Sequence, residues 1–158
     1  MIKEKEWFEI NPSELTLSSM SGARPDLGLP ETGILMLPSS PEHGAFFSGT
    51  LEIRDYFREK NPEMPIHIFA NDDEYKELAL HSADFWIGTF LVGSVIVPIF
   101  VNIISSYLYD ELKAKDGDHV SIDVIVERKD GKSSSVSYRG DVKDFGKVIE
   151  SVKKLADE

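Results

Sequence analysis

The sequence predicts an α+β fold with a small N-terminal α/β unit, a long central apolar helix and a C-terminal unit of two strands and one helix. Three observations support this prediction. Residues 85–109 carry no charged side chain. Apolar and polar residues alternate on both sides of an Asp-Gly pair near residue 130. The final segment places apolar residues at helical spacing between lysines and glutamates.

The composition limits the classes of partner. The chain has 158 residues and a formal charge of −11, which argues against a nucleic-acid partner because phosphate binding needs a basic surface. It has no cysteine, so disulfides and cysteine-ligated zinc are excluded. The N-terminal segment also lacks the basic and then apolar order of a secretory signal peptide.

Residues 1–30 are predicted to form an arm. An apolar cluster of Trp7, Phe8 and Ile10 is followed by a segment rich in Ser, Pro and Gly, which is typical of a loop or tether. Trp7 and Phe8 are candidate contacts for a partner. The alternative is that they pack on the body of the protein itself.

Residues 31–84 read as the small α/β unit. The apolar run at 33–37 and the alternating segment at 65–70 predict strands, and residues 45–47 suggest another. A helix is expected over 50–60, because the residue before a proline resists the helical conformation and the Asn-Pro pair that follows would end it.

A second helix is predicted to begin at Asn71. Asparagine is a preferred N-cap, and the three acids that follow complement the helix dipole. This helix would continue into residues 85–109, which are long enough to cross a bilayer. Trp86 at one end and Tyr109 at the other resemble the aromatic belts of membrane interfaces.

Two interpretations of residues 85–109 stay open. The stretch is either a membrane span or an assembly core buried between the chains of a soluble oligomer. In both cases small and polar residues would let helices approach closely and bond to each other. The candidate assembly residues are Trp86, Gly88, Gly93, Ser94, Pro98, Asn102, Ser105 and Ser106.

Residues 117–158 are predicted to form the C-terminal ββα unit. Residues 120–126 alternate, and Asp130-Gly131 predicts a hairpin with a type I′ turn. An amphipathic helix would follow from Asp141. Lys129, Lys132 and Arg139 on the hairpin form a small basic patch, which is a further candidate partner contact.

Few residues point to catalysis. The acids Asp72 and Asp73 support only a low-probability alternative, a metal-dependent hydrolase. The four histidines, which include His43 and His81, lack the i, i+4 spacing of a helical metal site. We therefore expect no catalytic residues, no metal and no cofactor.

The order of elements after residue 84 resembles the accessory modules called effector-associated constant components, which occur in prokaryotic defence systems. The shared order is an uncharged helix, a polar hinge at 113–118, the hairpin with Asp130-Gly131, and then Arg139-Gly140-Asp141 leading into an amphipathic helix. The resemblance covers about the last 75 residues. It implies a non-catalytic subunit that works beside a separate effector protein.

The sequence thus predicts a non-enzymatic, membrane-associated and otherwise cytoplasmic subunit. It would self-assemble through its apolar helix and bind or regulate an effector, as a homo-oligomer or with that partner. The alternative is a soluble structural or adaptor subunit of an oligomeric complex, with the apolar helix buried between chains.

Overall fold

A computed structural model describes residues 6–39, 44–79 and 85–158. The fold is mixed α+β, and in the described residues one sheet has the strand order β1-β8-β7-β6-β2-β4. Its strands are β1 (Trp7–Ser13), β2 (Ile34–Leu37), β4 (Ile66–Ile68), β6 (Phe85–Gly93), β7 (His119–Glu127) and β8 (Ser133–Asp141). Two short strands, β3 (Phe46–Phe47) and β5 (Glu77–Leu78), pair beside it.

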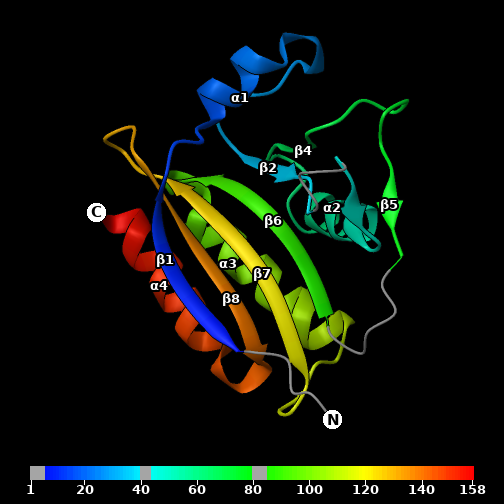
Figure 1. The fold of residues 1–158 in the computed structure, drawn as a ribbon, viewed down its shortest axis with the longest axis vertical. Coiled ribbons are helices and arrows are strands. Elements are labelled where there is room, and N and C mark those ends of the chain that lie inside the picture. Colours follow the sequence, from blue (N-terminus) through cyan, green and yellow to red (C-terminus); the bar gives the residue numbers. More distant parts are fainter. Residues whose placement is uncertain (1–5, 40–43, 80–84) are drawn as a thin grey trace.

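Helices cover the two faces of the large sheet unequally (Figure 1). The helices are α1 (Leu17–Ala23), α2 (Thr50–Lys60), α3 (Val97–Ser106) and α4 (Phe145–Asp157). Residues of α2, α3 and α4 share the main core with one face of the sheet. On the opposite face, α1 covers a smaller apolar cluster, and no other α-helix of the described residues covers the rest of that face.

The long apolar helix predicted over residues 85–109 is wrong. Phe85–Gly93 form the strand β6, and a short turn at Ser94–Ile96 leads into the ten-residue helix α3. None of the helices in the described residues has both the length and the apolar character needed to cross a membrane. The prediction of a single transmembrane helix is therefore wrong as well.

The position of β6 explains the charge-free run. β6 lies between β7, to which it is parallel, and β2, to which it is antiparallel. In the second part of β6, Phe90 and Val92 lie in the main core and Leu91 lies in the cluster under α1. A strand covered on both faces in this way reads as a continuous apolar run, which periodicity cannot distinguish from a buried helix. Pro98 lies in the first turn of α3, where a missing N–H removes no helical hydrogen bond. The proline therefore lies at the start of a helix and does not kink a helix interior.

A β-bulge interrupts β6 near its beginning. Trp86 pairs with Ser121 and Gly88 pairs with Ile122, so Ile87 is an extra residue on this strand. Gly88 has φ +135°, a conformation that residues with a Cβ rarely adopt. Because of the extra residue, Trp86 and Thr89 lie on the same face of the sheet although three positions separate them.

Aromatic rings fill the centre of the main core. Phe57 of α2 stacks on Phe100 of α3 with ring centroids 5.8 Å apart, and Phe100 meets Phe90 of β6 edge to face at 5.2 Å. All three side chains are at most 1 % exposed. One strand and two helices are thus joined by direct ring contacts.

The segment predicted as an arm begins with β1, an edge strand of the sheet, and the part after β1 is docked on the opposite face of the sheet. Leu17 of α1 packs against Leu35, Leu91 and Ile125. The backbone N–H of Leu17 donates to the Glu127 carboxylate at 3.2 Å, which satisfies one free donor at the start of this helix. At the end of α1, the Arg24 guanidinium contacts Glu74 at 2.7 Å.

The helix predicted from Asn71 stops after one turn. The expected cap is present, because Asn71 Oδ1 accepts from the Glu74 N–H at 2.9 Å and Glu74 Oε1 accepts from the Asn71 N–H at 2.7 Å. The chain then pairs as β5 with β3, and Tyr75 stacks on Phe46 with centroids 5.1 Å apart. Tertiary pairing therefore overrides a correct local start signal.

The hairpin and the helix predicted in the C-terminal segment are present as β7, β8 and α4. The predicted type I′ turn is wrong, since Gly131 has φ +85° but Asp130 keeps a negative φ. The Gly131 N–H donates to the Arg128 carbonyl at 3.0 Å, which closes a longer loop. Asp141 is the last residue of β8, and its carboxylate accepts from the backbone N–H groups of Lys143 and Gly117, which lower the pKa of Asp141.

The bulge at Gly88 gives the first prediction. Gly88→Ala should lower the free energy of unfolding by about 1–3 kcal/mol, because alanine is strained at this φ. The matched control is Gly146→Ala in α4, where an added Cβ meets nothing within 4 Å. That change should raise stability by about 0.5–1 kcal/mol. Urea unfolding of both variants checks the difference, and equal effects would contradict the bulge.

Candidate functional site

One cross-strand row of side chains lies on the sheet face that α1 leaves uncovered. Trp7 of β1 pairs with Arg139 of β8, Arg139 pairs with Ser121 of β7, and Ser121 pairs with Trp86 of β6. Residues directly opposite each other in adjacent strands place their side chains on the same face. Four neighbouring strands therefore bring two indoles, a guanidinium and a hydroxyl into one row.

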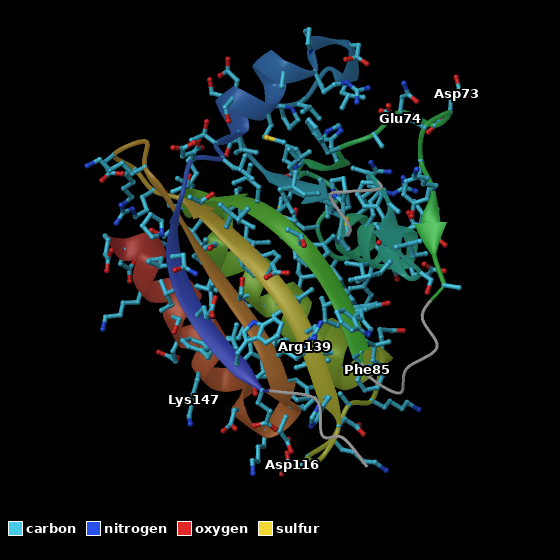
Figure 2. The ribbon with its side chains drawn as sticks, in the orientation of Figure 1. Asp73, Glu74, Phe85, Asp116, Arg139 and Lys147 are labelled. Atoms are coloured by element: carbon cyan, nitrogen blue, oxygen red, sulfur yellow. The ribbon has the colours of Figure 1, made fainter. Side chains whose placement is uncertain are left out.

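Arg139 lies between the two indoles of this row. Its Cζ is 4.6 Å from the ring centroid of Trp7 and 4.5 Å from that of Trp86. Its Nε–H donates to the Ser121 hydroxyl at 3.1 Å. Cation–π attraction on two sides and a hydrogen bond from Nε fix the guanidinium on the sheet. Figure 2 shows Arg139 on this face, between β1 and β6.

The row forms the floor of a cavity of about 590 Å³, which we call the open-face groove. The next cross-strand row also lines the groove, with Thr89 of β6 paired to Asp123 of β7. The Thr89 hydroxyl donates a long hydrogen bond to an Asp123 carboxylate oxygen 3.5 Å away. The groove therefore combines a cation, an anion and hydroxyls between aromatic walls.

The rim of the open-face groove is apolar. Phe47 of β3 meets Trp86 edge to face with centroids 4.8 Å apart, and Leu78 of β5 lines the same wall. Trp7 on the other side is 41 % exposed and Leu78 is 38 % exposed. The small β3–β5 sheet thus supplies one wall, and the edge strand β1 supplies the other.

Strand alternation explains why polar groups gather here. On β7, Val120 and Ile122 are buried in the main core, so the residues between and after them, Ser121 and Asp123, lie on the opposite face. Further along the same face Ile125 is apolar, and α1 covers it. The open face therefore has an apolar half under α1 and a polar half that forms the groove.

The ionic surroundings of Arg139 differ from those of three of the other four arginines in this acidic chain. Arg24, Arg54 and Arg128 each lie within 3.1 Å of a carboxylate oxygen. Within the described residues, no carboxylate lies within 4.0 Å of the Arg139 guanidinium. Its charge is thus balanced by ring faces and a hydroxyl rather than by an acid.

The predicted partner contacts are only partly brought together. Trp7 and Arg139 meet in the open-face groove. Phe8 lies on the other face of β1, where its ring contacts Tyr138 with centroids 6.2 Å apart. Lys129 and Lys132 lie in the loop before β8, while Arg139 lies near the end of that strand. The basic patch predicted from the sequence is therefore divided between two ends of the hairpin.

The candidate assembly residues do not share one surface. Trp86 and Gly88 line the open-face groove, whereas Gly93 approaches Leu17 and Thr32. Ser94 is buried in the turn after β6. The remaining four lie on α3, where Pro98 and Asn102 are exposed. Ser105 and Ser106 are partly buried.

Three polar residues of the groove floor were not predicted from the sequence: Thr89, Ser121 and Asp123. The alternation of β7 carries a usable signal for Ser121 and Asp123, because polar residues recur at every second position of an apolar strand. Thr89 carries no such signal, since the bulge at Gly88 shifts the side chains of β6 by one position.

A second cavity of about 500 Å³ lies between α2, β4 and the turn at 71–75. Arg54, Arg58 and His67 line it together with Asp26 and Asp72, so its cations face acids. Burial lowers the pKa of His67, and the nearby Arg58 lowers it further. Asp72 of the hydrolase alternative lies at this cavity and not in the open-face groove.

The described residues contain no group of three His, Asp or Glu side chains placed to hold a metal ion. His43 and His81 lie outside the described residues. In the open-face groove the side chains offer hydrogen-bond donors, acceptors and ring faces, which are suited to holding a ligand.

Arg139→Gln tests the energetic role of the two indoles. The variant should lose about 1–2 kcal/mol of stability, because both cation–π contacts disappear. Its fluorescence should also change, since Trp7 and Trp86 are the two tryptophans of the chain. Lys147→Gln on α4 is the control, because Lys147 is 79 % exposed and lies outside the groove. Identical emission spectra and unfolding curves for the two variants would contradict the contacts.

Comparisons with known proteins found no matching family model, no matching curated protein and no matching solved structure. The resemblance to effector-associated constant components therefore stays a prediction. The interpretation of the site rests on its geometry.

Proposed function

We propose that this chain is a non-catalytic subunit that binds a partner protein through the open-face groove. The observation that carries the proposal is the row of Trp7, Arg139 and Trp86 on an uncovered sheet face. Tryptophan and arginine are the residue types most enriched among those that dominate binding energy at protein interfaces.

The surroundings of this row support the proposal. Trp7 and Leu78 expose apolar surface on opposite sides of the groove, while Ser121, Thr89 and Asp123 offer polar groups on its floor. A centre of large anchors with nearby hydrogen-bonding groups is the usual composition of a protein interface. An effector protein, as the family resemblance implies, is one partner of this kind.

The groove is also held rigidly. Its floor comes from four paired strands, and Arg139 is fixed by two rings and a hydroxyl. A surface that is already ordered loses less conformational entropy on binding than a flexible one. The groove is therefore pre-organised, and a partner segment can bind without first ordering it.

A peptide-display selection tests the proposal. Random peptides selected on the wild-type protein should converge, and the selected peptides should bind Leu78→Asp at least about tenfold more weakly, because a charge at the rim opposes an apolar contact. Val95→Asp is the matched control, since Val95 is 74 % exposed and lies outside the groove. Selected peptides that bind both variants equally would contradict a groove interface.

A further inference from the structure

The charge and geometry of Arg139 indicate the chemistry of the groove's ligand. A guanidinium has five N–H donors in one plane. Among the described residues, the Arg139 Nε–H donates to the Ser121 hydroxyl, and the Nη groups have no hydrogen-bond acceptor. The Nη donors therefore remain for a ligand.

The two indoles restrict how a ligand can approach these donors. Trp7 belongs to β1 and Trp86 belongs to β6, so the rings reach Arg139 from opposite sides of its strand. The indoles take two sides of the guanidinium and Ser121 takes its Nε–H, so a third group reaches it at the edge that carries the Nη donors. A carboxylate is the protein group that fits this edge, because its two oxygens accept two parallel N–H bonds.

Asp123 adds a second requirement. It lies one row along the strands from Arg139 and Ser121, so an anion on Arg139 lies diagonally from a carboxylate. A bare anion is disfavoured beside Asp123 unless the same ligand also carries a donor. An extended peptide meets this requirement, because its backbone N–H groups recur at the spacing of the strand rows.

Resting on the proposed function, we infer that the groove binds an extended segment of the partner protein that carries an aspartate or glutamate with an apolar residue two positions away on each side, because alternate side chains of an extended chain point to the same face. The acidic side chain pairs with the Nη donors of Arg139. A backbone N–H next to it donates to Asp123, and the flanking apolar side chains contact Trp7 and Leu78 at the rim.

The probes are three short peptides. The first is acetyl-Leu-Ala-Glu-Ala-Leu-amide, and the second replaces its Glu by Gln. The third, acetyl-Leu-Ala-Gln-Ala-Leu with a free C-terminal carboxylate, tests a chain terminus as the source of the anion. Binding is followed by NMR through the Nε–H signal of Arg139 and the two indole N–H signals of the chain.

We expect the glutamate peptide to shift all three signals and to bind at least about tenfold more tightly than either glutamine peptide, because neither glutamine peptide places a carboxylate at the central position. Arg139→Lys should weaken the glutamate peptide by about tenfold although the charge is kept, since lysine offers neither the fork nor the stacked plane. The comparison of peptides on the wild-type protein does not depend on the variant folding.

Three results would overturn the inference. Equal binding of the two blocked peptides with shifts of the indole signals would mean that the groove binds peptides without selecting a carboxylate, and the proposed function would stand. Tighter binding of the free-terminus peptide would mean that Arg139 pairs with a C-terminal carboxylate and not with an acidic side chain. The third result is a glutamate peptide that leaves the indole signals unshifted at millimolar concentration while the display selection converges on the groove. It would exclude an acidic segment as the ligand, and the proposed function would stand.

Discussion

Every other part of the fold depends on the pairing of β6 along both of its edges. β7 binds one edge in parallel and β2 binds the other in antiparallel orientation, so this strand joins the C-terminal hairpin to the N-terminal strands and α2. On one face Phe90 meets Phe57 and Phe100, which tie α2 and α3 to the sheet. A central strand is satisfied by backbone bonds on both sides and by side chains on both faces, and in water this requires an apolar segment.

The same strand divides the opposite face into two regions. Leu91 belongs to the apolar half that α1 covers, whereas Trp86 and Thr89, which the bulge at Gly88 places on the same face, belong to the groove. The arm that carries α1 is held by Glu127 and by the Arg24 ion pairs, so the boundary between the two regions is fixed. The groove is thus the part of a continuous sheet face whose side chains hydrogen-bond and stack with each other instead of packing under a helix.

Local signals predicted the parts of the fold that local interactions decide. The hairpin, α4, β2 and α2 follow from alternation, helical spacing and the proline that ends α2 at Asn61. Residues 85–109 could not be assigned in this way, because burial on both faces removes the period of two that identifies a strand. Trp7 and Arg139 were recognised as contact candidates singly. Their meeting with Trp86 depends on strand order and on a bulge, and neither is encoded in a short segment.

The central claim is that residues 85–93 form a strand paired on both edges. Backbone chemical shifts and amide exchange, measured by NMR on the full chain, test it most directly. The account predicts extended-strand shifts over Phe85–Gly93, helical shifts that begin only after Gly93, and β6 amides among the slowest to exchange, because their opening requires global unfolding. Continuous helical shifts from residue 85 through residue 106 would contradict it.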